Sequence, residues 1–212
     1  MSHVSRAIAR HRRTSGFTLV EMMVVLVLMA VLMALAMPSF STWIRNSKVR
    51  TVADSLQTGL RLAQAEALRR NRQVVFTLTN DSPTSTTHAP TNDGKNWSLN
   101  SVAAYTGDSV AYIESGVLAD TSSGVQITGP AALCFNALGR IVDNPTPGFS
   151  GVQCALPSTT PPLRTYDVSF TDSVAGKDRP LRVTVALGGQ VRLCDPAKKL
   201  TGTDPAPDGC PD

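Results

Sequence analysis

The clearest feature of the hydrophobic pattern is an apolar run from Phe17 to Met37, whose only charged residue is Glu21. As a helix, these 21 residues rise about 31 Å, which is enough to cross the hydrocarbon core of a bilayer. A secretory signal has a shorter apolar region that is followed by a small-residue cleavage site. Here a polar segment, residues 1–16, precedes the run. The pattern therefore predicts a cleavable leader at 1–16 and a transmembrane helix at 17–37 that survives processing.

Beyond this run, apolar side chains recur every three or four residues, which predicts an amphipathic helix over residues 38–72 that continues into the globular domain. The apolar stripe consists of Val49, Val52, Ala53, Leu56, Leu60, Ala63 and Ala67. Pro38 lies at the junction and lacks a backbone N–H, so we expect a kink or a weak point there. The basic residues of this helix fall mostly off the stripe, and a solvated face is their simplest interpretation.

The periodicity changes to two at residues 74–79, as in a half-buried strand. A polar stretch over residues 80–96 predicts an exposed loop. Further strands are expected at residues 110–117, 125–128, 131–135, 165–170, 181–187 and 190–193. Short turns at residues 136–139 and 188–189 favour hairpins. The sequence thus predicts an α+β fold, with a long helix packed on antiparallel sheet and a β-rich globular domain over 73–212.

The junction Gly16-Phe17-Thr18-Leu19-Val20-Glu21 resembles the processing site of type IV prepilins and type II secretion pseudopilins. In that family a membrane peptidase cuts after the glycine and methylates the new N-terminus, which implies cleavage at Gly16 and methylation of Phe17. The resemblance also implies that Glu21 pairs with the amine of Phe17 on a neighbouring subunit, so that the two charges offset each other's desolvation. It gives Pro38 a role in assembly. The alternative is a plain signal anchor, but an intramembrane carboxylate is costly and is a functional candidate by default.

Two more segments sharpen this resemblance. Val74-Val75-Phe76 after Arg69-Arg70-Asn71-Arg72, and residues 189–196, are similar to the GspH/FimT branch of the family. The branch implies a pilin-like fold and a minor pilin of a type IV pilus or, alternatively, a minor pseudopilin of a type II secretion system. The implied partners are other pilins or pseudopilins, the prepilin peptidase and the inner-membrane assembly platform. The implied location is the bacterial inner membrane, crossed once, with the globular domain in the periplasm.

Charge bears on whether DNA is a partner. The chain has 20 basic and 16 acidic residues, but four arginines lie in the leader, so the processed chain is balanced. Residues 45–72 form its only cationic stretch. FimT-like pilins are associated with DNA capture through a C-terminal Gly-Arg-x-Arg motif, of which residues 189–192 keep only the last arginine. DNA is a candidate partner through Arg192, Lys198 and Lys199. The alternative is an exposed strand arginine beside two solubilising lysines.

The four cysteines, Cys134, Cys154, Cys194 and Cys210, lie in the segment expected outside the membrane. Three pairings are open, and the most local one would contribute roughly 3 kcal/mol per bridge in a chain-entropy model. Zinc is the competing interpretation, but the chain has no Cys-x-x-Cys pair and His88 is the only histidine beyond the leader. We therefore expect disulfides and no metal site.

The sequence carries no recognisable catalytic motif. A Ser-His-Asp triad would depend on His88, which falls in the most loop-like stretch of the chain. Residues 91–94 resemble the start of a calcium loop but lack the later acidic ligand, so a turn is expected there. No Gly-rich phosphate loop follows a strand. The sequence predicts neither an enzyme nor a cofactor.

Overall fold

The computed structural model describes residues 16–83, 86–118, 122–148, 151–156, 163–202 and 204–211. The chain divides into two compact units, Met1–Ser41 and Thr42–Asp212. One helix, α1 (Leu19–Arg70), contributes to both of them, and its backbone stays helical through Pro38. Residues 1–15 of the predicted leader lie outside the described part of the chain.

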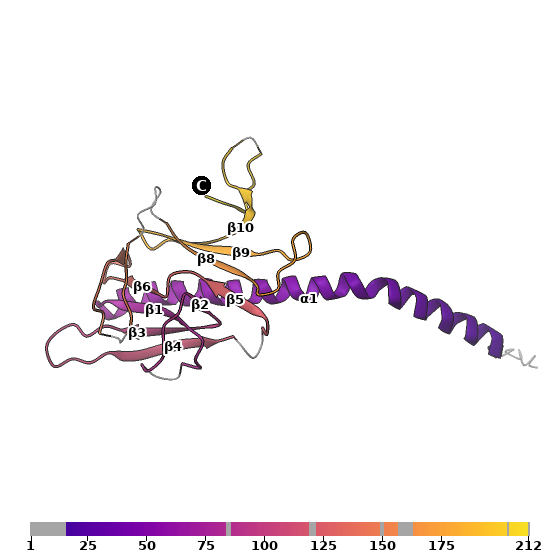
Figure 1. The fold of residues 1–212 in the computed structure, drawn as a ribbon, viewed down its shortest axis with the longest axis horizontal. Coiled ribbons are helices and arrows are strands. Elements are labelled where there is room, and N and C mark those ends of the chain that lie inside the picture. The colour runs from indigo at the N-terminus through magenta and orange to yellow at the C-terminus, as the bar shows by residue number, and fades with distance from the viewer. Residues whose placement is uncertain are drawn as a thin grey trace, which may run out of the picture. The chain divides into compact units, whose positions relative to one another are not determined.

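The second unit contains two sheets around its part of α1 (Figure 1). The first sheet has the order β4 (Ala111–Val117), β3 (Asn96–Ser101), β1 (Val74–Thr79), β6 (Ala132–Phe135) and β7 (Ile141–Val142). The second has the order β11 (Gly209–Cys210), β10 (Val191–Lys199), β9 (Leu181–Ala186), β8 (Leu163–Phe170), β5 (Val125–Thr128) and β2 (Asp93–Gly94). The strands pair antiparallel except for β10 and β11, which run parallel. The predicted α+β fold is confirmed.

The apolar stripe of α1 forms the centre of the core, as its spacing predicts. Every stripe residue from Val49 to Ala67 is buried, and the stripe packs against apolar side chains of both sheets. Phe76 of β1 joins the two sheets, since its ring lies 6.0 Å from Trp97 of β3 and 5.8 Å from Tyr166 of β8. Burial of this stripe against two sheets holds the second half of α1 in place.

Trp97 determines how closely β4 and α1 approach it. A Cβ atom added at Gly59 of α1 would lie 2.9 Å from the indole ring, and one added at Gly116 of β4 would overlap that ring. The indole Nε1 donates to the Ser55 hydroxyl at 3.4 Å. Glycine at both positions is thus required by the volume of the indole.

The middle strands of the first sheet, β3, β1 and β6, are covered on both faces, which differs from the half-buried strand expected at residues 74–79. All six residues of β1 are buried. Val75, Cys134 and Cys154 belong to a second apolar cluster on the side away from α1. The described residues of the stretch 80–96 are mostly exposed or partly exposed, as expected, but the stretch also contains β2 and bonds to β1. The Thr77 hydroxyl lies 2.7 Å from Nε2 of His88. Alternation of apolar and polar residues along a strand predicts one buried face. It cannot predict that distant loops also bury the other face.

Two strands were not recognised at their true extent. β3 carries the sequence Asn-Trp-Ser-Leu-Asn-Ser, and all six of its residues are buried although four are polar. β10 continues to Lys199, past Pro196, where the sequence predicted an end at residue 193. Proline fits there because β11 pairs with β10 only at Asp195 and Lys199, so Pro196 is not required to donate to that ladder.

The two predicted turns meet each other in space. Gly139 and Gly189 both have positive φ, at 73° and 84°. A Cβ atom added at Gly189 would overlap the carbonyl oxygen of Gly139, which accepts a 3.0 Å hydrogen bond from Gln64 of α1. Nearby, the Ile141 amide donates to the carbonyl of Leu187 at 3.1 Å. This contact joins β7 of the first sheet to the end of β9 in the second.

Candidate functional site

The start of α1 carries a reciprocal cap. Thr18 precedes the helix, and its hydroxyl accepts a hydrogen bond from the amide of Glu21 at 3.2 Å. Oε2 of Glu21 in turn accepts from the Thr18 amide at 3.2 Å and from its hydroxyl at 3.3 Å. This capping box satisfies two backbone donors that an α-helix otherwise leaves open. Only an assembly role was predicted for Glu21, although the Thr-x-x-Glu spacing is the sequence signal for this cap.

Only one oxygen of the Glu21 carboxylate is used in this cap. Within the part of the chain that the structure describes, Oε1 of Glu21 accepts no hydrogen bond. A carboxylate has about four acceptor positions over its two oxygens. Glu21 can therefore keep its cap and accept a further donor from outside the chain.

The first part of α1 presents apolar side chains on all sides. Within the first unit, the large apolar residues from Phe17 to Met37 are at least half exposed, with Phe17 itself at 80%. Among the described residues, α1 is the one helix that is long and apolar enough to cross a membrane. A helix that is apolar all round needs either a lipid environment or other helices around it.

The second unit anchors a loop through Arg45, a group that the sequence analysis treated as part of a solvated face. Its guanidinium donates to both oxygens of Asp178, at 2.7 and 2.8 Å, and reaches Asp172 at 3.2 Å. The same guanidinium lies 3.9 Å from the centre of the Phe170 ring. Hydrogen bonds from Arg45 and from the Val174 amide lower the pKa of Asp178 to about 2. This clamp ties the β8–β9 loop to the helix.

The end of α1 is neutralised in a similar way. Glu66 pairs with Arg69 and Arg70, both at 2.6 Å, and these hydrogen bonds lower its pKa to about 2. Arg72 pairs with Asp108 at 3.0 Å. The cationic stretch at 45–72 is thus largely compensated by carboxylates within the domain, which removes much of its attraction for a polyanion.

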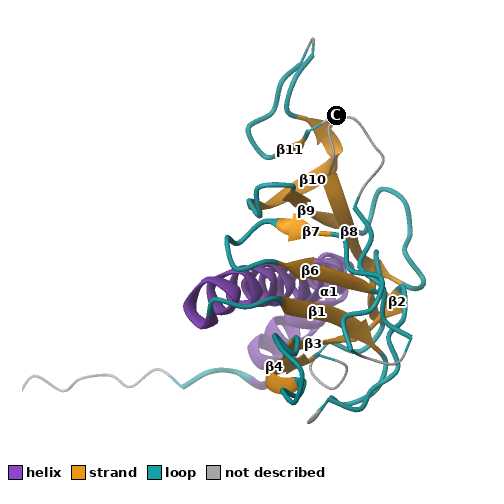
Figure 2. Cartoon of the chain, turned by 90° about the vertical axis from the view of Figure 1, so that its left-hand side faces the viewer, coloured by secondary structure: helices purple, strands orange, loops and turns teal. Residues whose placement is uncertain are grey.

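Two disulfides are present, and they are the most local of the three pairings. Cys134 bonds to Cys154 beneath the second apolar cluster, and Cys194 bonds to Cys210. The second bridge ties β10 to β11. Figure 2 shows these two strands at the end of the second sheet. Within the described residues, no group of three or more His, Cys, Asp or Glu side chains is placed to hold a metal ion.

The three candidate DNA contacts do not form one basic surface. Lys198 is engaged with Asp208 at 2.6 Å, which raises the pKa of the lysine. Arg192 lies opposite Thr184 on β9, and strand alternation places it on the other face of the sheet from Leu193, which packs on the core. Residues 191–212 contain three basic and four acidic side chains. DNA binding through these residues stays a prediction.

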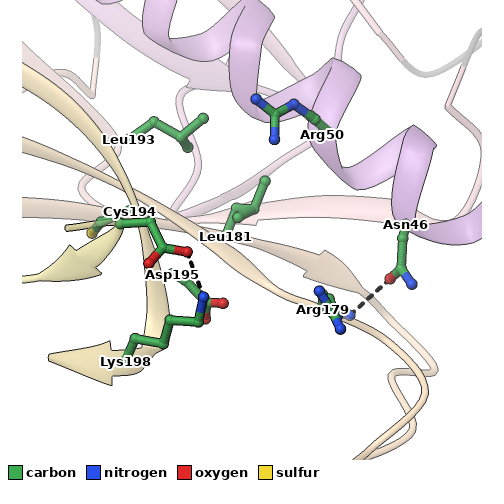
Figure 3. Close-up of a pocket in the computed structure, with 9 residues that line it drawn as sticks. Asn46, Arg50, Arg179, Leu181, Leu193, Cys194, Asp195 and Lys198 are labelled. Atoms are coloured by element: carbon green, nitrogen blue, oxygen red, sulfur yellow. Dashed lines mark hydrogen bonds and ion pairs between the residues drawn. The ribbon is translucent and has the colours of Figure 1, made fainter. Parts of the chain in front are cut away.

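A cleft of about 320 Å³ lies between α1 and the second sheet, beside the C-terminal tail (Figure 3). Three cationic side chains line it, Arg50, Arg179 and Lys198, together with the carboxylates of Asp195 and Asp208. The amide of Arg179 donates to Asn46 of α1 at 2.8 Å, and this bond holds the start of β9 against the helix. No local sequence pattern predicted this cleft, because its residues come from three separate stretches of the chain.

A long helix, apolar at its start and covered by antiparallel sheet in its second half, defines a pilin-like protein. The prokaryotic N-terminal methylation motif matches residues 11–37. The family described as "Type II transport protein GspH" matches residues 52–189, nearly two thirds of the chain. The chain therefore belongs to this family of minor pilins and pseudopilins. Pilins and pseudopilins are structural components rather than enzymes.

The chain is similar to two kinds of solved structure. The type IV minor pilin FimU of Pseudomonas aeruginosa matches at 18% identity and a TM-score of 0.44, over 70% of this chain and 93% of FimU. The minor pseudopilin EpsH of the type 2 secretion system of Vibrio cholerae matches at 14% identity and a TM-score of 0.45, over 71% of this chain and 99% of EpsH. No curated protein sequence matches the chain.

Proposed function

We propose that this chain is a minor subunit of a pilin-type fibre, anchored in the bacterial inner membrane before it is assembled. A prepilin peptidase removes residues 1–16 and methylates Phe17. Residues 17–37 then hold the protein in the bilayer, with the globular domain in the periplasm. The partners are other pilins or pseudopilins and the inner-membrane assembly platform, and the role of the chain is to start or extend the fibre.

The observation that carries this proposal is the position of Glu21. It is the only charged residue of the apolar run, it lies five residues beyond Gly16, and its Oε1 is open to an outside donor while Oε2 caps the helix. The new amine of Phe17 on a neighbouring subunit is a donor of opposite charge. Pairing the two groups offsets the cost of placing each of them in an apolar surrounding and sets the register between subunits.

Mass spectrometry of the mature protein tests the processing step. We expect loss of residues 1–16 and one added methyl group on Phe17. An intact leader in cells that hold an active prepilin peptidase would contradict the proposal.

A matched pair of variants tests the assembly step. In Glu21→Gln the side-chain oxygen can still accept the hydrogen bonds from Thr18, but the charge is gone. We expect this variant to be processed normally and to be missing from purified fibres, whereas Thr18→Ala weakens the cap and leaves the charge. If Glu21→Gln enters fibres as well as the natural chain does, the charge is not what sets the register.

The fibre is either a type IV pilus or a type II secretion pseudopilus, because the N-terminal chemistry is common to both. The genes beside this one discriminate between the two. Genes of a type IV pilus place the chain in a pilus, and genes particular to type II secretion place it in a pseudopilus. A further role in DNA uptake depends on the tail residues Arg192, Lys198 and Lys199.

A further inference from the structure

We propose that the cleft between α1 and the second sheet is a docking site for an acidic side chain, next to an apolar one, on a neighbouring subunit. We name it the two-arginine cleft, after Arg50 and Arg179. The inference rests on the proposed function, because it takes the partner to be another subunit of the same fibre.

Two arginines of the cleft carry positive charge that the domain itself leaves largely uncompensated. The Arg179 guanidinium has no ion pair among the described residues. It also lies close enough to Lys198 for the two positive charges to repel each other. The Arg50 side chain is 71% exposed, and its one ion pair with a described residue is a 3.8 Å contact with Asp54. By contrast, Lys198 is paired with Asp208. The cleft thus holds two under-neutralised guanidinium groups, and a carboxylate is the group that guanidinium binds with two parallel hydrogen bonds.

Part of the cleft lining is apolar. Leu181 and Leu193 are partly buried against the core and still line the cleft, which Figure 3 shows with Leu181 near the centre of the view. The cleft volume of about 320 Å³ is at the small end of the range for ligand sites, of about 300–1,000 Å³. It suits one or two side chains. An apolar residue beside the acid would cover the leucines and keep water from the ion pair.

The walls of the cleft are held in place by bonds within the domain before any partner binds. Asn46 accepts a hydrogen bond from the Arg179 amide at 2.8 Å and donates to the carbonyl of Lys177 at 3.4 Å. On the opposite wall, the disulfide between Cys194 and Cys210 fixes β10 to the tail. Groups that are already in place lose little conformational entropy on binding.

The lining favours a polypeptide over a nucleic acid. Asp195 and Asp208 stand beside the cations, and they repel a backbone that carries a negative charge at every phosphate. A protein segment can bring one isolated carboxylate to the arginines and place amide or ammonium donors against the aspartates. Electrostatic complementarity of this mixed kind gives specificity for one partner.

Site-specific photo-crosslinking in cells that build the fibre tests the inference. The crosslinking amino acid replaces Ala197, an exposed residue next to Lys198, in the full chain. A second chain carries it at Leu138, which is 75% exposed on the turn beside Gly139, as a position control. The double variant Arg50→Glu with Arg179→Glu removes the attraction, and Arg140→Glu, an exposed arginine without an ion pair among the described residues, is the matched control.

We expect the crosslink at position 197 to map to a pilin-type subunit, at a peptide that holds Asp or Glu beside an apolar residue. Its yield should fall about tenfold in the double variant and hold steady in Arg140→Glu. Changing the mapped acid to lysine should restore the crosslink in the double variant, which shows that the double variant still folds.

Other results overturn the inference. They are a crosslink to DNA, a crosslink to a segment without an acid, a yield unchanged by the charge reversals, or no crosslink at position 197 from chains that are processed and present in the fibre. In each of these cases the proposed function stands. Absence of the natural chain from processed fibres contradicts the proposed function instead.

Discussion

Trp97 and Gly116 lie face to face across the β3–β4 ladder, where the register pairs them directly and the indole covers the glycine. Because a Cβ atom at position 116 would overlap the ring, Gly116→Ala should force Trp97 out of its place between β4 and α1. We expect a loss of about 1–3 kcal/mol in the free energy of unfolding, measured by chemical denaturation. Gly188→Ala is the matched control, since no atom lies within 4 Å of a Cβ added there. Equal stability of the two variants would contradict this packing.

Tyr166 buries a hydroxyl that has no hydrogen-bond partner in the described structure. Complete burial also raises the pKa of this phenol well above its ordinary value. Removal of an unsatisfied polar group relieves its desolvation cost, so Tyr166→Phe should stabilise the domain by about 1 kcal/mol. Tyr112→Phe is the control, since that hydroxyl donates to Ser115 on an exposed edge. A loss of stability in Tyr166→Phe would show that the hydroxyl has a partner.

Acid should destabilise the domain over a definite pH range. The pKa of Asp178 falls from its ordinary value of 3.8 to about 2 in the folded chain, because Arg45 bonds to its charged form. A carboxyl with a lowered folded pKa contributes stability that is complete above pH ~4 and is lost as the pH falls toward ~2. Asp178→Asn should therefore lower the melting temperature at pH 7 and flatten its decline between pH 4 and 2.

Glu66 follows the same rule, since its pKa falls from 4.5 to about 2 beside Arg69 and Arg70. Part of the acid response should thus remain in Asp178→Asn and become smaller when Glu66→Gln is added. The rest belongs to other carboxyls whose pKa is also lowered, namely Asp108, Asp172 and Asp208. Asp54→Asn serves as the control, because Asp54 is half exposed and its contact with Arg50 is 3.8 Å long. An unchanged acid response in the double variant would disprove the assignment.

The two disulfides should differ in what their loss affects. The bridge between Cys134 and Cys154 lies in a buried cluster, so replacing both residues by serine should lower global stability by about 3 kcal/mol or more. The same change at Cys194 and Cys210 should instead loosen the tail, because that bridge joins β10 to β11 at the end of a sheet. Hydrogen exchange separates the two, with faster exchange confined to the tail in the second case. Equal effects on the core would contradict this division.

DNA binding is tested on the full chain in detergent, by titration with duplex at 50 and 200 mM salt. If the tail binds DNA, the binding should be weak and lost at high salt, because few basic groups are available and Lys198 is already paired with Asp208. Arg192→Ala should weaken it and Arg140→Ala should not. No binding at 50 mM salt removes DNA as a partner.

The sequence predicted those parts of the fold that depend on periodicity along the chain. The buried stripe from Val49 to Ala67 needs only a repeat of three to four residues, and the helix and most strands follow from similar local signals. β3 was missed because four of its six buried residues are polar. The Asn100 side chain donates to the Ser98 hydroxyl at 3.0 Å, while its own Oδ1 has no partner in the described structure. Alternation carries no information about such tertiary cover.

The candidate site divides in the same way. The Thr18–Glu21 cap and the processing junction are contiguous in sequence and can be read from it directly. The Arg45–Asp178 clamp joins residues 133 positions apart, and the two-arginine cleft draws on three distant segments. A charge count registers such groups as free basic side chains, because partners that come together only on folding have no sequence signature.

The contact between the turns at Gly139 and Gly189 limits how this domain can be re-engineered. The two turns are in direct contact, and Gln64 donates a hydrogen bond to the carbonyl of Gly139 beside that contact. The two hairpins are therefore not independent modules. A foreign epitope grafted into either one would displace its partner and separate β7 from β9.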